Sequence, residues 1–478
     1  MSTTSLSTLL RGMPTPVPVS AEDVLSARKA SNEKTIYIVL DDDPTGTQSV
    51  AQLPVLTAWQ PEDFRWAFAT GAPAIYVMTN SRSLSPADAE RVNREVVTSA
   101  LAAAGKLPLA FISRSDSTLR GHFPLEPLTI ADEITKAGKP PIDGIILVPA
   151  FGDAGRITVA GMHYAGNERE GFVPVGESEF ARDATFGYTA SELASWVEEK
   201  SSGVISRDDV LTISLTQLRQ DHDQVVGILS SATNMQVIVP DIVQEEDLRL
   251  LALALIKAEA AGANFVYRVG PPFPRARIGQ DIHDPVTLDE IRVSRGKRQL
   301  SLGGLIVVGS HVDLTTQQLN HLCASQSPVE LELDAARVTD PDTRDAHVEN
   351  LSTQAAQALN SGNVVISTSR IVITGADGKD SLAISRHISQ ALVEVVQRIL
   401  AINPPRFVVA KGGITSSDVA AKGLGFRHAT VVGPMLPGIV SLWSGQDGPA
   451  AGIPYVVFAG NVGQADSLAA VVAKLSQA

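Results

Sequence analysis

Short runs of apolar, β-branched residues alternate along the chain with longer stretches in which apolar residues recur every three or four positions. A continuous apolar run is typical of a strand buried on both faces, and the longer spacing is typical of a helix with one buried face. Alternation of the two patterns predicts parallel strands joined by crossover helices. The expected fold class is therefore α/β, with two domains, each a mostly parallel sheet flanked by helices.

The predicted elements fall into two series. Strands of the first series are expected at 35–40, 74–79, 109–113, 144–148, 211–215, 236–239 and 264–269, with helices at 86–103 and 245–261. Strands of the second series are expected at 305–308, 329–333, 363–368, 406–410, 429–432 and 454–458. Helices of the second series are expected at 315–324, 346–359, 385–402, 416–421 and 465–475.

A stretch with little periodicity separates the two series. Residues 270–300 are rich in Pro, Arg and Gly, which is typical of a connection between domains. We therefore expect an N-terminal arm at 1–34, a first domain at 35–269, a connection at 270–300 and a second domain at 301–478. The arm has no apolar core long enough for a signal peptide and is expected to be a loose polar segment.

The composition of the chain excludes several classes of protein. The chain has 478 residues and 44% hydrophobic content, enough for two cores, and no apolar run approaches the roughly 18 to 20 residues that span a bilayer. A single cysteine, Cys323, excludes an internal disulfide framework, and its helical surroundings indicate packing rather than nucleophilic chemistry. The net charge of −13 argues against non-specific binding of nucleic acid. We expect a cytoplasmic protein with no membrane or nucleic-acid partner.

Polar residues directly follow four predicted strands of the first series, in segments 41–46, 79–82, 114–121 and 149–156. The first segment opens with three adjacent aspartates, although aspartate is a poor strand former and neighbouring negative charges repel. Turns and helix caps would account for any one of these segments. Four of them at one edge of a parallel sheet favour a binding site, because ligands bind beyond the carboxyl ends of such strands.

The residue types in these segments indicate a ligand with both carboxylate and hydroxyl groups. Arginine presents a planar fork suited to carboxylate, while Ser, Thr and Asp pair with hydroxyls. A small polyhydroxy acid satisfies both. Two roles are open to the adjacent aspartates: accepting a proton from a hydroxyl and binding Mg²⁺. Crowding is expected to raise at least one of their pKa values.

The second series ends its strands in glycine-rich turns, in segments 308–311, 410–418 and 458–463. Paired glycines let the backbone approach a ligand closely, and free N–H groups at a helix start attract phosphate. Neither the Walker A pattern nor GxGxxG is present. The 9 histidines show no metal-binding spacing, so no metal ligands are assigned, and His311 is expected to be a capping or core residue.

Together these motifs resemble the four-carbon acid sugar kinase family. The resemblance is carried by Asp42-Asp43-Pro-Thr45-Gly46, Asp116-Ser-Thr-Leu-Arg120-Gly121, Pro149-Ala-Phe with Gly155-Arg156 and Gly161-Met-His163-Tyr, Lys411-Gly412-Gly413-Ile-Thr415, and Gly460-Asn461. It spans about residues 36 to 463 and implies ATP-dependent phosphorylation of threonate, erythronate or an oxidised relative such as 3-oxo-tetronate.

The resemblance also implies which residues form the sites. The acid-sugar site in the first domain would contain Asp42, Asp43, Arg82, Arg114, Ser115, Asp116 and Ser117, to which we add Arg120 and Arg156. The nucleotide site in the second domain would contain Ser310, Gly412, Gly413, Ile414, Thr415 and Gly460, to which we add Lys411 as a group that steadies transferred charge. Expected cofactors are ATP and Mg²⁺.

We hypothesise that the acid docks by its carboxylate on Arg82, Arg114 or Arg120 and that Asp43 or Asp116 takes the proton from the attacking hydroxyl. Domain closure would bring the reactants in line. Asp41 is expected to be solvated. The alternatives are a nicotinamide-dependent hydroxy-acid oxidoreductase, which lacks its glycine fingerprint here, and a non-catalytic sugar-acid-binding protein. The sequence does not decide the oligomeric state, and a homodimer is one option.

Overall fold

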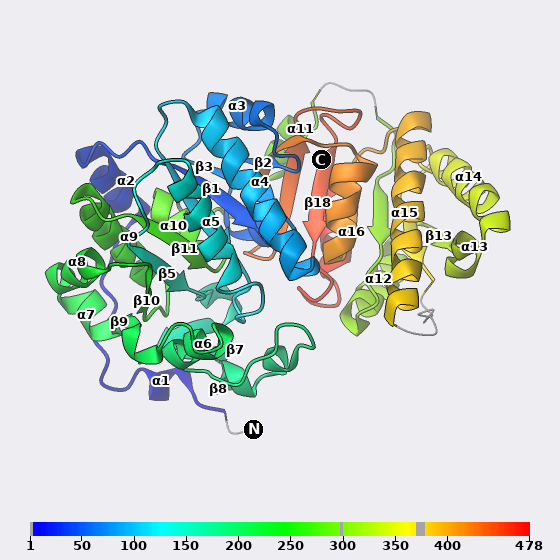
Figure 1. Cartoon of the computed structure of the whole chain (residues 1–478). Coiled ribbons are helices and arrows are strands. Elements are labelled where there is room, and N and C mark those ends of the chain that lie inside the picture. The colour runs from blue at the N-terminus through cyan, green and yellow to red at the C-terminus, as the bar shows by residue number, and fades with distance from the viewer. Residues whose placement is uncertain (1–2, 297–299, 370–377) are drawn as a thin grey trace. The chain divides into compact units, whose positions relative to one another are not determined.

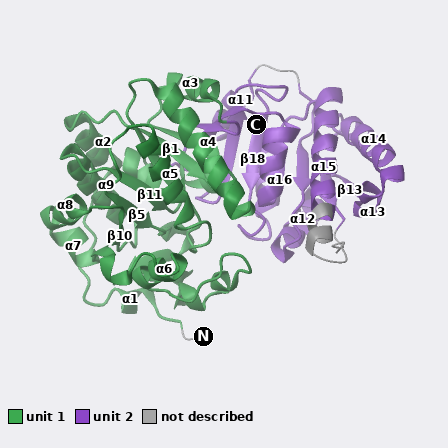
Figure 2. Ribbon diagram, in the orientation of Figure 1, with its two compact units in different colours: residues 1–50, 59–282 green, residues 51–58, 283–478 purple. Residues whose placement is uncertain are grey.

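The computed structural model describes residues 3–296, 300–369 and 378–478. They form two compact units (Figure 2). Unit 1 consists of Met1–Val50 and Trp59–Ile282, and unit 2 of Ala51–Ala58 and His283–Ala478.

Unit 1 is built on a parallel sheet with the strand order β3-β1-β4-β11-β5-β10-β9. Its strands are β1 (Ile36–Asp41), β3 (Ala74–Met78), β4 (Leu109–Arg114), β5 (Gly144–Val148), β9 (Leu211–Ile213), β10 (Gln236–Pro240) and β11 (Phe265–Val269). A small antiparallel sheet is formed by β6 (Arg156–Val159), β7 (Met162–Asn167) and β8 (Gly171–Pro174).

Helices pack against the parallel sheet of unit 1. One group, on the near side in Figure 1, contains α3 (Pro61–Ala69), α4 (Pro86–Ala104) and α5 (Leu125–Lys136). A second group that packs together contains α2 (Ala21–Ala30), α7 (Leu215–Gln220), α8 (His222–Ser231), α9 (Glu245–Ala260) and α10 (Pro272–Ile278). The remaining helices are α1 (Leu6–Leu9) and α6 (Leu193–Lys200).

Unit 2 has the strand order β13-β14-β12-β15-β18-β17-β16-β2. The first five strands in this order are parallel and the last three are antiparallel. The strands are β2 (Leu53–Leu56), β12 (Leu305–Val308), β13 (Val329–Leu333), β14 (Val364–Thr368), β15 (Val408–Lys411), β16 (His428–Leu436), β17 (Val440–Gly445) and β18 (Pro454–Phe458).

The helices of unit 2 also form two groups. One contains α13 (Ala335–Thr339), α14 (Pro341–Ala358) and α15 (Gly378–Ile402), and the other contains α11 (Leu288–Ser294), α12 (Asp313–Gln326) and α17 (Ser467–Gln477). Between β15 and β16, α16 (Gly413–Asp418) continues into a π-helical turn (Val419–Gly423). No helix in the described ranges is long and apolar enough to span a membrane.

Local chemistry explains where the predicted elements begin and end. All six residues of β1 are buried, as expected for a strand covered on both faces. Helix α4 begins after Ser85, whose hydroxyl accepts from the backbone N–H of Asp88, and Pro86 takes the first helical position. The predicted α/β class with mostly parallel sheets is confirmed.

Some elements differ from the sequence prediction. The strand expected at 211–215 stops at Ile213, because Ser214 caps α7 through a capping box with Gln217. The stretch 270–300, expected to be irregular, contains α10 and α11. The second of these has its own capping box, Thr287 with Glu290, which the pattern analysis overlooked. Strands β2, β6, β7, β8 and β17 were not predicted.

The expectation of a loose N-terminal arm is wrong. Thr4 forms a β-bridge with Phe172 on β8, with N···O distances of 2.9 and 2.8 Å. Further along, Leu6, Leu9, Leu10 and Met13 pack on an apolar cluster that includes Phe172. The arm is therefore part of the packed structure of unit 1, because its scattered apolar residues bury area there.

A buried ion pair binds the arm at Pro14 to the rest of unit 1. Arg219 donates to both carboxylate oxygens of Asp247 at 2.7 and 2.8 Å, and a third nitrogen donates to the Pro14 carbonyl at 2.6 Å. Asp247 also accepts from the backbone N–H groups of Val243 and Gln244. Both charged side chains are almost completely buried.

Asp247→Asn should lower the free energy of unfolding of unit 1 by about 3–5 kcal/mol, because it leaves the Arg219 charge buried without its partner. Chemical denaturation followed by circular dichroism measures this loss. Asp223→Asn, at a 97% exposed carboxylate, is the matched control and should change stability by no more than about 0.5 kcal/mol. Equal stability of the two variants would contradict the structural role assigned to the pair.

Candidate functional site

The parallel register of unit 1 places three of the predicted polar segments at one edge of its sheet. Asp41, the last residue of β1, lies opposite Met78 on β3 and Arg114 on β4. The chain segments that follow these three strands therefore leave the sheet side by side. We call the charged residues of these segments, with their buried partners, the edge cluster: Asp41, Asp42, Asp43, Arg82, Arg114, Asp116, Arg120, Glu126 and Arg268.

Asp42 and Arg82 form the centre of the edge cluster. Two nitrogens of Arg82 donate to the two carboxylate oxygens of Asp42, at 2.6 and 3.1 Å. The Asp42 side chain is 2% exposed. Burial raises the pKa of Asp42 to about 7, while Arg82 acts in the opposite direction. The expected upward shift is present, but burial rather than crowding by other aspartates is its main cause.

Asp43 is the more accessible neighbour, with a side chain that is 25% exposed. Its Oδ1 accepts from the Thr45 backbone N–H at 2.9 Å and from the Thr45 hydroxyl. Among the described residues, its Oδ2 has a hydrogen bond with Arg82 alone, at 3.5 Å. One carboxylate oxygen of Asp43 thus retains capacity for a further hydrogen bond.

Asp116 is held by two arginines. Arg120 Nε donates to Asp116 Oδ2 at 2.7 Å, and Arg82 Nη1 lies 4.0 Å from Oδ1. Thr118 also donates to this carboxylate. Burial acts to raise the pKa of Asp116, but Arg82, Arg120 and the hydrogen bonds outweigh it and hold the pKa well below its usual value.

The expectation that Asp41 is solvated is wrong. Its side chain is completely buried and forms an ion pair with Arg114, which is 3% exposed. Arg114 Nη2 also donates to the Asp43 carbonyl at 2.7 Å. Burial lowers the pKa of Arg114 to about 9. Arg114 therefore fixes the aspartate segment through both a side chain and a backbone carbonyl.

The two predicted serines lie within the loop that follows β4. Ser115 is completely buried, and its backbone N–H donates to the Val269 carbonyl at 2.9 Å. Ser117 is 8% exposed, and its carbonyl lies 2.8 Å from Nε2 of the buried His163. The same loop receives a hydrogen bond from the Tyr188 hydroxyl at the Thr118 carbonyl, 2.6 Å away. These contacts fix the backbone that carries Asp116.

Sequence analysis missed two buried members of the edge cluster. Glu126, on α5, accepts from Ser113 at 3.1 Å and from Ser81. Arg268, on β11, is fully buried; its Nη2 donates to the Arg120 carbonyl at 3.0 Å, while its Nε and Nη1 have no hydrogen-bond partner. A charged residue inside the apolar run Phe265–Val269 was the available signal, but only the strand order shows that β11 adjoins β4.

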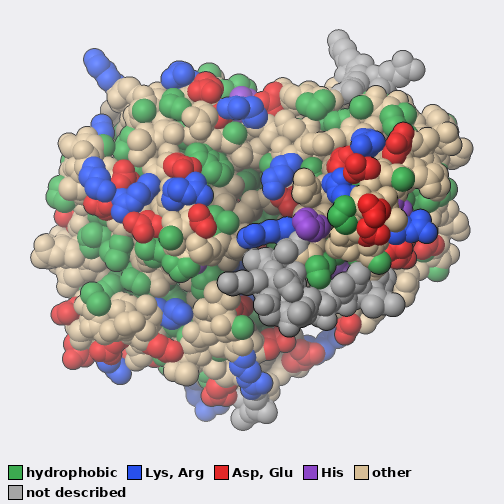
Figure 3. All heavy atoms as spheres, turned by 45° about the vertical axis from the view of Figure 1, so that its right-hand side comes forward, with side chains coloured by type: hydrophobic (Ala, Val, Ile, Leu, Met, Phe, Trp, Pro, Cys, Tyr) green, Lys and Arg blue, Asp and Glu red, His purple; other side chains and the backbone are tan. Residues whose placement is uncertain are grey.

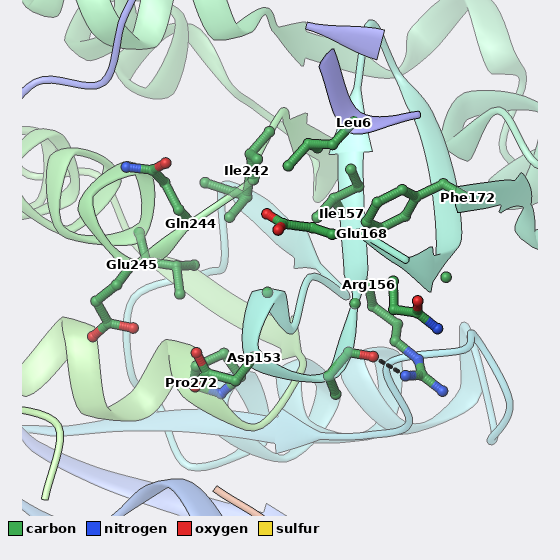
Figure 4. Close-up of a pocket in the computed structure, with 17 residues that line it drawn as sticks. Leu6, Asp153, Arg156, Ile157, Glu168, Phe172, Ile242, Gln244, Glu245 and Pro272 are labelled. Carbon is green, nitrogen blue, oxygen red and sulfur yellow. Dashed lines mark hydrogen bonds between the residues drawn. The ribbon is translucent and has the colours of Figure 1, made fainter. Parts of the chain in front are cut away.

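Arg156 begins β6 in the small antiparallel sheet, whereas the other predicted arginines lie at or beyond the ends of β3 and β4. A pocket of about 570 Å³ is lined by the segment Gly152–Ile157, which includes Arg156, by the start of α9 and by Leu6 and Phe172. Figure 4 shows the Arg156 guanidinium directed away from Ile242 and Gln244, with its hydrogen bond to the Ala154 carbonyl. Of the predicted site residues, this pocket includes Arg156 alone.

The predicted nucleotide residues of unit 2 gather around one serine. Ser310 follows β12, Gly412 follows β15, and Gly460 follows β18, three strands that are neighbours in the sheet. A Cβ atom at Gly460 would lie 2.5 Å from Ser310 Oγ, and one at Gly412 would lie 3.2 Å from Ser310 Cβ. The Thr315 hydroxyl joins Ser310 to the Gly460 carbonyl at 3.1 and 2.8 Å.

The glycines are required by this close packing of backbone. Gly412 has a φ of +127°, a conformation that disfavours any side chain, whereas Gly413 begins α16. A Cβ at Gly309 would overlap Thr415. Ile414 is 66% exposed beside this turn. The arrangement presents bare backbone at the carboxyl ends of three parallel strands, which fits the approach of a phosphate or ribose.

Lys411 is buried beneath the turn. Its Nζ donates to the Ala459 carbonyl at 2.6 Å and lies 3.9 Å from the centre of the Phe458 ring. In the described parts of the chain no carboxylate lies within ion-pair distance of it. Burial lowers the pKa of Lys411 from its ordinary 10.5 to about 7.

Two other candidate residues, His311 and Cys323, have contacts that do not require a catalytic role. His311 bonds to the Ser369 carbonyl at 3.0 Å. Cys323 is half-buried against the core of unit 2, and burial together with Glu330 raises its pKa to about 12, which agrees with a packing role. Within residues 3–296, 300–369 and 378–478, no three His, Cys, Asp or Glu side chains group as a metal site would require. On the face shown in Figure 3, basic and acidic side chains are interspersed.

Lys411→Met should change how stability depends on pH. Between pH 7 and 10 the unfolded chain keeps the Lys411 proton while the folded protein releases it, so the wild-type free energy of unfolding rises with pH relative to the variant. The expected gain is up to about 1.4 kcal/mol per pH unit. Below pH 7 both states are protonated and the difference is constant.

Denaturant melts of wild type and variant at matched pH values measure this difference. Lys422→Met, at an exposed lysine, is the control and should show no such trend. A constant difference from pH 7 to 10 for Lys411→Met would show that the buried amine stays charged.

Two family models match the chain. Residues 37–277 match the family model described as a sugar-binding N-terminal domain, and residues 305–468 match that of a nucleotide-binding C-terminal domain. The first range contains the edge cluster, and the second contains the turn at Gly412. No curated protein matches the chain.

Two solved structures share the fold. A Salmonella typhimurium LT2 protein, provisionally described as a tRNA synthase, has 17% identity and a TM-score of 0.64, with 91% of this chain and 98% of that chain covered. A Haemophilus influenzae protein has 16% identity and a TM-score of 0.60, with the same coverage. At these identities the likeness concerns the fold alone. The family models together span most of the chain, which therefore belongs to the family that joins a sugar-binding N-terminal domain to a nucleotide-binding C-terminal domain, as its resemblance to the four-carbon acid sugar kinases predicts.

Proposed function

We propose that the protein is an ATP-dependent kinase that phosphorylates a hydroxyl of a small sugar acid. One observation carries this proposal: the region matched as sugar-binding holds the arginine and aspartate side chains of the edge cluster, and the region matched as nucleotide-binding holds the glycine turn around Ser310. A kinase needs both an acceptor site and a nucleotide site, whereas a sugar-binding protein needs only the first.

The acceptor end needs a group that takes the proton of the attacking hydroxyl. Asp43 is our choice, because its Oδ2 has only the 3.5 Å contact with Arg82 and its side chain is partly exposed. Asp116 is less suited, because two arginines favour its charged form and lower its basicity. Asp42 is nearly buried and accepts two hydrogen bonds from Arg82. We therefore propose that Asp42 orients that arginine.

The nucleotide end needs backbone that phosphate can approach. Gly412, Gly460 and Ser310 offer such backbone, and we propose that they hold the phosphates of ATP with Thr415. Mg²⁺ bound with the nucleotide would neutralise charge on the transferred phosphoryl group, as is usual for kinases. We assign no protein ligand to it. The Nζ of Lys411 already donates to the Ala459 carbonyl. We therefore propose that Lys411 fixes the turns after β15 and β18 and does not bind phosphate directly.

The reaction requires the acceptor hydroxyl and the terminal phosphate to meet in line. The two proposed sites belong to different units, so we propose that closure of the units during turnover brings them together and excludes water. The proposed acceptors are threonate, erythronate, 3-oxo-tetronate and branched relatives such as oxo-isoapionate.

Nucleotide turnover tests the proposed function. Purified protein is incubated with ATP, Mg²⁺ and each member of a panel of four- to six-carbon sugar acids, and ADP and the phosphorylated acid are measured by mass spectrometry. Formation of both with at least one acid is expected. Binding of acids without ATP consumption would indicate a binding protein, and reduction of NAD by a hydroxy acid would indicate an oxidoreductase.

Asp43→Asn should reduce kcat by about 10²-fold or more, the usual scale for the loss of a general base, and leave the melting temperature almost unchanged. Steady-state kinetics measure the loss. Asp208→Asn, at an exposed residue distant in sequence, is the control. Normal turnover by Asp43→Asn with an inactive Asp116→Asn would move the base to Asp116.

Gly412→Ala should raise the KM for ATP roughly tenfold and leave the KM for the acid nearly unchanged, because a Cβ there would crowd Ser310 and Thr415 at a φ that disfavours side chains. Gly362→Ala, where a Cβ would meet nothing within 4 Å, is the matched control. Equal increases in both KM values in a well-folded variant would mark the turn as a packing element.

A further inference from the structure

The arginines of unit 1 differ in how much of their charge is already neutralised. Arg82 and Arg114 are engaged by carboxylates, the first by Asp42 and the second by Asp41. Arg114 is also almost fully buried. These two arginines therefore have little capacity left for the carboxylate of a substrate, although both are predicted substrate-binding residues.

Arg120 is only partly engaged. Its Nε donates to Asp116 at 2.7 Å, but its Nη1 has only a distant carboxylate, Asp183 at 3.8 Å. The side chain is 25% exposed. The outer nitrogens of this guanidinium are thus the accessible ones.

Arg156 has no carboxylate partner. No Asp or Glu of the described chain lies within ion-pair distance of its guanidinium, whose one hydrogen bond goes to the Ala154 carbonyl. Its Nε is buried and has no partner at all. The Arg156 side chain is partly exposed, and its one buried, unpaired nitrogen is costly unless an anion completes its surroundings.

A single aromatic ring holds both guanidinium groups. The Cζ atoms of Arg120 and Arg156 lie 5.5 and 5.4 Å from the centre of the Phe180 ring, within the range of a cation–π contact. Phe180 lies in a short 3₁₀ helix, Glu179–Arg182, that follows the small antiparallel sheet. It was not among the predicted site residues.

The two arginines act on one another electrostatically. Burial lowers the pKa of Arg156 and the nearby charge of Arg120 lowers it further, while Asp116 and Glu179 act in the opposite direction. The carboxylates of Asp116 and Asp183 lie 2.7 and 3.8 Å from Arg120, whereas none in the described residues lies within ion-pair distance of the Arg156 guanidinium. A substrate carboxylate fits this place, because it can accept from two guanidinium groups at once.

Resting on the proposed function, we propose that Arg156 and Arg120, held on Phe180, receive the carboxylate of the sugar acid. They would thereby select acids over neutral sugars and polyols of the same length. Asp43 and the remaining hydroxyl-binding groups would then face the other end of the substrate.

Binding measured without nucleotide tests this inference. Isothermal titration compares each accepted acid with its primary amide, which keeps every hydroxyl but lacks the charge. Wild type should bind the amide about 10- to 100-fold more weakly, the scale of losing hydrogen bonds to a charged group. Arg156→Gln should weaken acid binding by a similar factor and discriminate poorly between acid and amide.

Further variants separate charge, geometry and fold. Arg156→Lys, which keeps the charge but not the fork, should bind the acid with intermediate affinity, and Phe180→Leu should weaken it about threefold. Arg182→Gln, an exposed arginine of the same 3₁₀ helix, is the matched control and should bind like wild type. Melting temperatures and binding of ATP with Mg²⁺ show that each variant is folded.

The outcomes distinguish this inference from the proposed function. If Arg156→Gln and Phe180→Leu bind the acid as tightly as wild type, or if wild type binds acid and amide equally, the inference is overturned while the kinase proposal stands. If acid binding depends on Arg156 but no nucleotide is consumed, the kinase proposal fails and the inference stands. Absence of binding by wild type to every acid overturns both.

Discussion

The arrangement of unit 1 depends on the neutralisation of three adjacent aspartates at the end of a buried strand. Charges removed from water are costly unless they are paired. Parallel pairing of β1 with β4 sets Asp41 beside Arg114, and the segment after β3 supplies Arg82 to Asp42. The aspartates could not be tolerated at this place if either neighbouring strand were shifted, so the acidic motif and the sheet register constrain one another.

This pairing also sorts the charged residues by accessibility. Asp41, Asp42 and Arg114 are almost removed from solvent, and Arg82 reaches Asp42 from a partly exposed position. Asp43, Asp116 and Arg120 also retain partial exposure. We propose that the chemistry belongs to Asp43 and its partly exposed neighbours, and that the buried groups hold them in position before substrate arrives.

Unit 2 differs from unit 1, because it packs three turns closely together without charged side chains between them. Ser310, Gly412 and Gly460 pack so closely that a Cβ at Gly460 would overlap Ser310 and one at Gly412 would crowd it. The single charge beneath them, Lys411, is buried against a carbonyl and a ring, and its pKa falls as a result. In the proposed nucleotide site these turns offer bare backbone in place of the common glycine fingerprints.

The pattern of apolar residues was sufficient for the fold class and for most strands, because a buried parallel strand must be apolar on both faces. It was insufficient for elements whose signals are short or polar. The small antiparallel sheet, β2 and β17 pack in contexts that the pattern does not reveal, and the capping box that starts α11 was hidden in a stretch rich in Pro and Arg. The apolar residues of the N-terminal arm were visible, but their partners were not.

By itself, the sequence determined which residue types end each strand, and hence that carboxylates, hydroxyls and arginines gather at one edge and glycines at another. Only the tertiary structure decided which of those groups pair with one another. Strand order placed Arg268 between β4 and β5, set Asp41 against Arg114 rather than in solvent, and brought Phe180 to Arg120 and Arg156. The physical reason is that charge pairing depends on distances of a few ångströms between segments far apart in the chain, and local sequence does not encode those distances.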